Sequence, residues 1–247
     1  MRGVLAAAGV FMTIAADAAA AEIKVLGTQS MVLVWNEIAP KFEQQTGHTV
    51  SMTPHIAATA KRMIDAGERF DVAILTPAVI DQLIKESQLI ANTRTDIMRV
   101  GIGVAVRAGQ DKPDISSVEA FKNTLLNAKS IAYLKTGVSG IYLSELMKRL
   151  GIAEDLKSKT ILPEGDVVGP MVARGEAQMG ITAMSTLRAT PGLEIVGPLP
   201  PEIQSYVTFT GGVSTSTTSP DAGRDLLQFL TSPAALPAMR AKGLEPS

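Results

Sequence analysis

The segment Phe70-Asp71-Val72-Ala73-Ile74-Leu75-Thr76 indicates the fold class of this chain most directly. Its centre is apolar at consecutive positions instead of alternating, which is typical of a parallel strand buried on both faces of a sheet. A helical pattern follows at residues 77–88. Because a buried strand that leads into a helix is the repeating unit of α/β proteins, this segment predicts an α/β fold.

The same alternation extends outward from this segment in both directions. Upstream, the patterns predict strands at 22–26 and 49–53 and helices at 31–45 and 59–66, with Gly47 following the first helix as a stop signal. Downstream, strands are predicted at 99–106, 130–134, 159–162, 179–183, 193–198 and 206–215, and helices at 117–126, 140–150, 167–174, 221–230 and 234–241.

Two of these strands, 99–106 and 206–215, alternate strictly and contain glycine, so they could link two α/β sets. We therefore expect two lobes joined by two crossover strands, with a ligand cleft between them. Lobe one would comprise residues 22–98 plus 206–247, and lobe two residues 99–205.

The first 21 residues have the pattern of a secretory signal peptide. Arg2 is followed by a small and apolar run at 4–16, and four alanines precede the charged Glu22, which fits an Ala-x-Ala cleavage site. The alternative is a membrane anchor, but the run is shorter than the roughly 20 residues that a bilayer requires. The sequence thus predicts a mature protein in the periplasm.

Composition excludes several classes of function. The net charge is -1, which gives no electrostatic basis for binding nucleic acid or an anionic membrane. The chain has no cysteine, which excludes thiol catalysis, disulfides, Cys-ligated zinc and a lipid-bearing Cys anchor. A single Trp, 3 Tyr and 6 Phe leave few rings for stacking on a sugar, so a sugar ligand is disfavoured.

Several candidate binding loops share one design, in which a strand ends, a short Gly, Ser or Thr segment follows, and a helix begins. Helix starts carry unpaired N–H groups and partial positive charge, so several of them around one cleft would bind an anion. The alternative is that each Ser or Thr only caps its own helix. The candidate ligand-binding residues are Thr28, Gln29, Ser30, Ala58, Thr59, Lys135, Thr136, Ser139, Val167 and Ala183.

The order and separation of these segments resemble a known family. The matching stretches are Phe42-Glu43-Gln44-Gln45-Thr46-Gly47, residues 66–72, Gly137-Val138-Ser139-Gly140-Ile141-Tyr142, and Gly165-Asp166-Val167 followed by Gly180-Ile181. They are similar to the molybdate-binding, ModA-like branch of periplasmic solute-binding proteins of bacterial ABC importers. The resemblance implies a type II two-lobe fold with hinge closure on the ligand, a monomer, and a membrane permease as partner.

The resemblance also carries over ligand contacts, and two of them depart from the family's pattern. It implies a hydroxyl at Ser30 and amides at Ser139 and Val167, but alanine stands at 57 and 58 and again at Ala183, where the family has a tyrosine. Oxyanion oxygens without donors would cost about 1–3 kcal/mol each, so molybdate is disfavoured as the ligand. The missing tyrosine also enlarges the pocket, which suits a small di- or tricarboxylate.

A carboxylate ligand would favour a fixed cation nearby. Lys135 is the best placed in sequence, with Arg62 and Arg174 as further candidates, and a solvent-facing lysine is the alternative for Lys135. His55 precedes the second loop and either donates to a carboxylate or is a satisfied buried residue. His48 follows a helix stop and is expected at the surface.

Two functions remain open from the sequence. The first is a binding protein that captures a small anion for an importer, without a cofactor or metal, since two histidines and no nucleophile elbow supply neither a triad nor a metal site. The second is a cofactor-independent enzyme resembling aconitate isomerases. Its donors would come from the same loops, and its base would be His55, Lys135 or Asp166.

Overall fold

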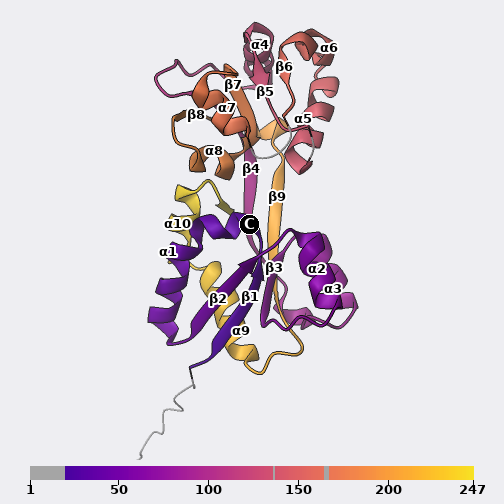
Figure 1. The fold of residues 1–247 in the computed structure, drawn as a ribbon, viewed down its shortest axis with the longest axis vertical. Coiled ribbons are helices and arrows are strands. Elements are labelled where there is room, and N and C mark those ends of the chain that lie inside the picture. Colours follow the sequence, from indigo (N-terminus) through magenta and orange to yellow (C-terminus); the bar gives the residue numbers. More distant parts are fainter. Residues whose placement is uncertain (1–19, 136, 164–166) are drawn as a thin grey trace, which may run out of the picture.

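The computed structural model describes residues 20–135, 137–163 and 167–247, and it has two α/β lobes stacked along the long axis (Figure 1). The predicted signal peptide lies outside the described residues except for Ala20 and Ala21. Thr136 and Asp166, two of the predicted site residues, also lie outside them. The mixed α/β class and the two-lobe arrangement that the sequence predicts are confirmed.

The first lobe is built on three parallel strands that alternate with helices. β1 (Glu22–Gly27) pairs with β2 (Thr49–Pro54) on one side and with β3 (Val72–Leu75) on the other. α1 (Gln29–Thr46), α2 (Ala57–Asp65) and α3 (Pro77–Lys85) each follow one of these strands, and α9 (Pro220–Leu230) and α10 (Leu236–Ala241) complete the lobe.

The apolar face that the sequence predicts for the first helix is the face that α1 buries. Met31, Ile38 and Phe42 have no exposed surface, because residues spaced three and four apart share one side of a helix. Gly47 ends the helix with a φ of 76°, a left-handed conformation that glycine adopts without a Cβ penalty. His48 was predicted at the surface but is buried beside Phe42, with the ring centroids 6.1 Å apart, and its Nδ1 accepts a hydrogen bond from the Ala21 amide at 3.1 Å.

The second lobe repeats the design with shorter strands. β5 (Ile131–Ala132) pairs in parallel with β6 (Thr160–Ile161) and with β7 (Met179–Ala183). Its helices are α4 (Val118–Asn127), α5 (Gly137–Arg149), α6 (Ala153–Leu156), α7 (Val168–Arg174) and α8 (Met184–Ala189). Short 3₁₀ turns lie at Ala91–Thr93, Lys157–Lys159 and Pro201–Ile203.

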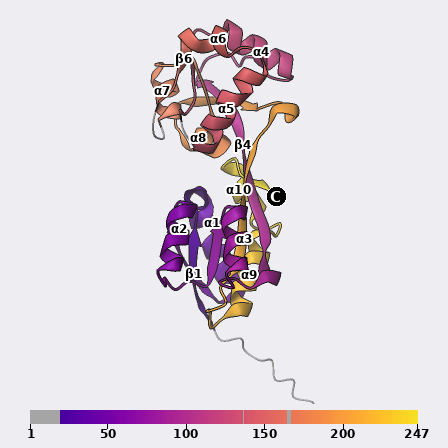
Figure 2. The ribbon, with the colours of Figure 1, turned by 90° about the vertical axis from the view of Figure 1, so that its right-hand side faces the viewer.

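Two long strands run side by side from one lobe to the other (Figures 1 and 2). β4 (Thr95–Arg107) pairs through residues 95–101 with β9 (Tyr206–Val213), and through residues 102–107 with β7 and with β8 (Leu193–Pro198). β9 in turn pairs with β3, so the sheet order is β2-β1-β3-β9-β4-β7-β5-β6. The C-terminal β10 (Glu245–Pro246) also pairs with β4.

Side-chain contacts reinforce the region where the connecting strands pass between the lobes. The Gln204 side chain accepts a hydrogen bond from the Ile102 amide and donates one to its carbonyl, each at 2.9 Å. The Arg99 guanidinium lies 4.0 Å from the centroid of the Tyr206 ring and 3.1 Å from a Glu245 carboxylate oxygen. These contacts hold β4, β9 and the C-terminal strand together.

Each lobe has its own hydrophobic core, and a buried methionine of the second lobe packs in the core of the first. Phe42 lies in the largest cluster of the first lobe, and Phe121 in that of the second. Met184, at the start of α8 in the second lobe, packs in the first-lobe cluster. Gly103 and Gly243 leave no room for a Cβ beside this methionine, so both backbones approach it closely.

Candidate functional site

Two buried polar atoms lie at the carboxyl edge of the first-lobe sheet. Thr28 follows β1 and occupies the N-cap position of α1, but its side chain makes no capping hydrogen bond. The residue is 6% exposed, and its Oγ1 is buried and has no hydrogen-bond partner among the described residues. Ser117, in contrast, does cap α4 by accepting from the Ala120 amide. Capping of its own helix therefore does not account for Thr28.

His55 lies beside Thr28 because β1 and β2 run in parallel and end together. Gly27 is in register with Pro54, and the His55 amide donates to the Gly27 carbonyl at 2.9 Å. The Nε2 of His55 is also buried and without a hydrogen-bond partner within the described part of the chain. The imidazole is therefore not the satisfied structural histidine that the sequence left as an alternative.

The start of α2 adds a hydroxyl and a cation to this edge. The Thr59 hydroxyl accepts a hydrogen bond from Nη2 of Arg62 at 3.1 Å, while Ala58 is exposed and offers only its backbone. Lys61 is paired with two carboxylates, Asp65 and Glu86. Its hydrogen bond with Asp65, and to a lesser extent that with Glu86, raises the pKa of its ammonium group and keeps it charged. Arg62 is thus the predicted cation that the structure brings to this edge.

The second lobe contributes a cavity of about 140 Å³ against the connecting strands. Ser139, in the first turn of α5, and Ala183, at the end of β7, lie in its wall, so the structure brings these two predicted residues together. The rest of the wall was not predicted as part of the site; it consists of Val100, Gly101, Ile102, Leu134, Ser205 and Val207. The alternating apolar pattern of the two crossover strands is the signal that could have identified most of these residues.

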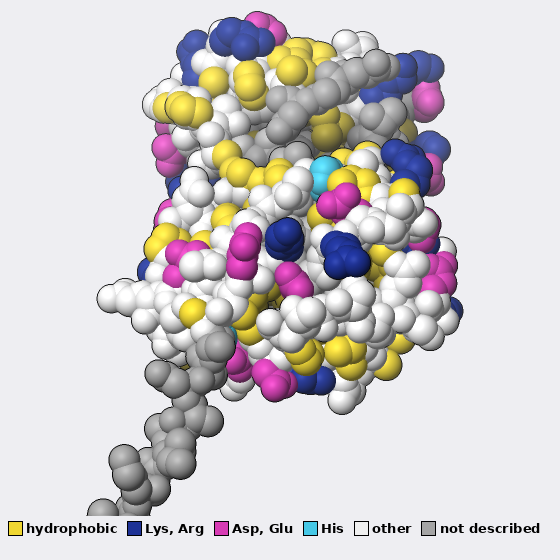
Figure 3. Space-filling view, turned by 60° about the horizontal axis from the view of Figure 1, so that its bottom comes forward, with side chains coloured by type: hydrophobic (Ala, Val, Ile, Leu, Met, Phe, Trp, Pro, Cys, Tyr) yellow, Lys and Arg dark blue, Asp and Glu magenta, His cyan; other side chains and the backbone are white. Residues whose placement is uncertain are grey.

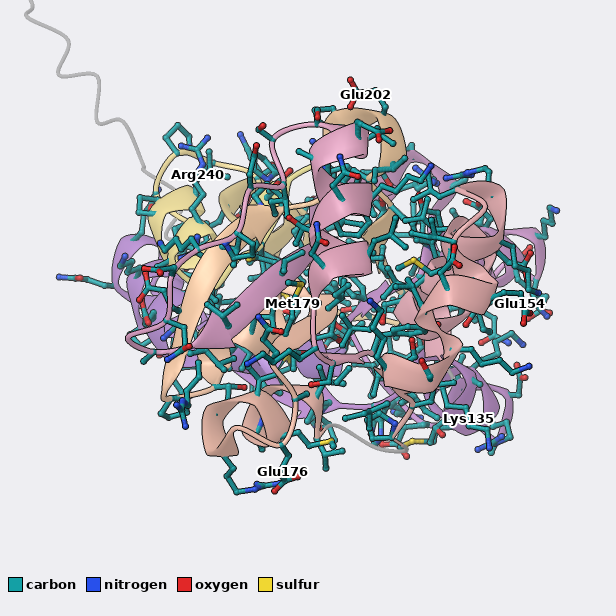
Figure 4. The ribbon with its side chains drawn as sticks, turned by 90° about the horizontal axis from the view of Figure 1, so that it is seen from above. Lys135, Glu154, Glu176, Met179, Glu202 and Arg240 are labelled. Atoms are coloured by element: carbon teal, nitrogen blue, oxygen red, sulfur yellow. The ribbon has the colours of Figure 1, made fainter. Side chains whose placement is uncertain are left out.

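The other predicted residues lie around these two groups. Gln29 and Ser30 are the first residues of α1, and Val167 is exposed at the N-cap of α7. Lys135 is exposed at the rim of the second lobe, well away from Met179 at its centre (Figure 4), and its amide donates to the Pro163 carbonyl. Thr136 and Asp166 stay untested as site residues.

Arg174 is not a site cation in this structure. It lies in the last turn of α7, where its Nε is 2.6 Å from a carboxylate oxygen of Glu176. The hydrogen bond with Glu176 raises the pKa of the Arg174 guanidinium and lowers the pKa of the Glu176 carboxyl. Each of these two charges is therefore balanced by the other at the protein surface.

Neither Thr28 nor His55 belongs to the wall of the 140 Å³ cavity. The convergence of both groups on one ligand stays a prediction. Within residues 20–135, 137–163 and 167–247, no group of three or more acidic or histidine side chains could hold a metal ion. Across the same ranges, no helix has the length and apolarity to cross a bilayer.

Two α/β lobes joined by crossing strands, with polar strand ends in each lobe, define the class of two-lobe solute-binding proteins. The family model described as bacterial extracellular solute-binding protein matches residues 23–245. This chain therefore belongs to that family, which places it outside the cytoplasm. The predicted resemblance to the ModA-like branch is confirmed as well.

Individual relatives fall into two groups. The chain is 34% identical over 230 residues to an aconitate isomerase of a Pseudomonas species, covering 91% of this chain and 87% of the relative. It is 28% identical over 241 residues to the molybdate-binding protein ModA of Azotobacter vinelandii, covering 93% and 92%.

Solved structures share the fold at lower identity. A substrate-binding domain ascribed to a molybdenum ABC transporter of Clostridium difficile superposes with a TM-score of 0.81 at 17% identity, covering 92% of this chain and 100% of that one. The periplasmic molybdate-binding protein of Azotobacter vinelandii gives 0.65 at 16% identity, covering 91% and 99%. At these identities the likeness shows the fold alone.

Proposed function

We propose that this protein captures a small anion, an oxyanion or a small di- or tricarboxylate, and delivers it to a membrane ABC permease. The observation that carries the proposal is the pair of buried atoms, Thr28 Oγ1 at the start of α1 and His55 Nε2 just after β2, which have no hydrogen-bond partner among the described residues. Each costs about 1–3 kcal/mol while unsatisfied, and a bound ligand would supply the missing partner. The positive end of α1 favours an anionic ligand over a neutral one.

We also propose where the protein acts, its oligomeric state and how its lobes close. Residues 1–21 act as a cleaved signal peptide that delivers the protein to the periplasm, where it works as a monomer. Lobe one comprises 22–98 plus 206–247, lobe two comprises 99–205, and the lobes close on the ligand by bending β4 and β9. The near-neutral charge of -1 supports a small-molecule ligand and not a nucleic acid.

We expect a thermal-shift screen to detect the ligand among molybdate, tungstate, sulfate, phosphate, citrate and the two aconitate isomers. A ligand at 100 times its Kd adds about 2.7 kcal/mol to the free energy of unfolding. For a chain of this length, that corresponds to a rise in Tm of about 5–10 °C. Thr28→Val should reduce the rise, because it removes the hydroxyl and keeps the shape of the side chain.

The matched control is Thr218→Val, which changes an exposed threonine in the first lobe and should leave the shift unaltered. If no anion raises the Tm of the wild-type protein, the proposed anion site is wrong.

A second candidate function is isomerisation of a tricarboxylate on the same scaffold. Two observations favour it: the 34% identity with an aconitate isomerase and the unpartnered Nε2 of His55, which could accept a proton from an acidic C–H group. The step needs no oxidant, because the proton removed from one carbon returns to another as the double bond shifts.

Incubation with trans-aconitate separates the two functions. If the protein only binds and delivers its ligand, the absorbance and NMR spectra of trans-aconitate stay unchanged over hours. Steady formation of the cis isomer, abolished by His55→Gln and retained by Thr218→Val, would establish the isomerase function instead.

A further inference from the structure

We propose that the ligand is a di- or tricarboxylate whose short hydrocarbon skeleton occupies the 140 Å³ cavity beside β4 and β9. This inference rests on the proposed function and narrows it, because the same cleft could otherwise serve a tetrahedral metal oxyanion.

The wall of the cavity suits hydrocarbon. Among its lining residues only Ser139 and Ser205 carry a polar side chain, and the others are aliphatic or glycine, with Val100 and Ile102 almost fully buried. An apolar cavity of about 150 Å³ stays dry and accommodates a six-carbon ring. A cavity of this size and lining can therefore hold the carbon skeleton of a small organic acid.

The same wall is unsuited to a tetrahedral oxyanion. Four oxygens of such an ion would each require donors, and every oxygen left without one would cost about 1–3 kcal/mol. Ala183 offers no donor side chain, and its methyl group adds to the apolar wall. Within this wall, an oxyanion would exchange its hydration shell for only two side-chain hydroxyls, those of Ser139 and Ser205.

Carboxylates of the same ligand would find donors in the cavity wall and, once the lobes close, on the first lobe. Ser139 lies in the first turn of α5, a helix of 13 residues whose free amides favour negative charge. On the first lobe, Thr28 Oγ1 and His55 Nε2 stay buried and unpartnered until a second carboxylate meets them on closure. Polar groups at two ends and an apolar middle match a skeleton with a carboxylate at each end.

Apolar side chains are also exposed at strand ends and helix starts of both lobes. Ile56, before α2, is 66% exposed, and Ile141, in the first turns of α5, is 62% exposed. Leu162 and Val167, on the second lobe, are exposed as well. Figure 3 shows hydrophobic side chains along the boundary between the two lobes. Such side chains favour an organic ligand, because burying apolar surface away from water lowers the free energy of the complex.

Calorimetric titration of the wild-type protein tests the ligand class. Propane-1,2,3-tricarboxylate and succinate serve as organic probes, and molybdate and sulfate as oxyanions. We expect at least one carboxylate to bind about 100-fold more tightly than either oxyanion, the discrimination that missing hydrogen bonds can supply. Tighter binding of molybdate would overturn this inference and leave the proposed function standing, whereas absence of binding by all four would contradict both.

Cavity variants test the location. Ala183→Leu fills the cavity and should raise the Kd for the carboxylate by about tenfold or more. Ala189→Leu makes the same change at an exposed position at the end of α8, the helix that follows Ala183, and should alter the Kd less than about twofold. Val207→Thr keeps the volume, adds a hydroxyl to the wall, and should weaken binding about threefold or more. An unchanged Kd in the folded Val207→Thr protein would overturn the inference, even if Ala183→Leu failed to fold.

Discussion

Phe42→Ala should lower the free energy of unfolding by about 3–5 kcal/mol, the usual cost of removing a fully buried ring. Phe42 is completely buried in the first-lobe core, and its ring centroid lies 5.5 Å from that of Phe229 on α9. The substitution removes this aromatic contact and leaves a cavity between α1 and α9. Urea denaturation followed by circular dichroism measures the change.

Phe42→Leu is the matched variant, because it keeps an apolar side chain at the same position and should cost clearly less. A loss below about 1 kcal/mol for Phe42→Ala would show that α1 and α9 repack without the ring, contrary to the close packing expected of protein cores.

Gly140→Ala should lower the Tm and also abolish measurable ligand binding. A Cβ at residue 140 would overlap the carbonyl oxygen of Leu134, so the first turn of α5 would have to move away from the end of the preceding strand. That turn carries Ser139, and both Ser139 and Leu134 line the 140 Å³ cavity. The strain should cost about 1–3 kcal/mol in stability and displace the proposed carboxylate donors.

Ser144→Ala, one turn further along α5, should leave binding intact, because it changes no group in the cavity wall. Differential scanning calorimetry and titration with the identified ligand measure both effects. Unaltered affinity in Gly140→Ala would exclude the start of α5 from the binding site.

Local patterns were sufficient for most elements of the fold. The strands predicted at 179–183 and 193–198 coincide with β7 and β8, and the apolar run at 72–75 forms the buried β3. Elements that depend on distant contacts were missed. α8 is only six residues long, and β10 exists because it pairs with β4 and because Glu245 contacts Arg99.

In the site, too, residues next to strand ends could be predicted from sequence, whereas residues brought together by strand pairing could not. Thr28, His55, Ser139 and Ala183 were identifiable because they follow strand ends, where α/β proteins bind ligands. The 140 Å³ cavity was not, because Val100 and Val207 become neighbours only when β4 and β9 pair. The pairing of Arg174 with Glu176 likewise required coordinates.

The position of Met184 has a consequence for how the lobes can move. This side chain belongs to one lobe and packs in the core of the other, close to Gly103 and Gly243. Methionine has three rotatable side-chain bonds and adapts to irregular spaces, so it can follow a changing angle between its neighbours. It can thus keep the two lobes in contact at this point when the angle between them changes, without leaving an empty space beside Gly103 and Gly243.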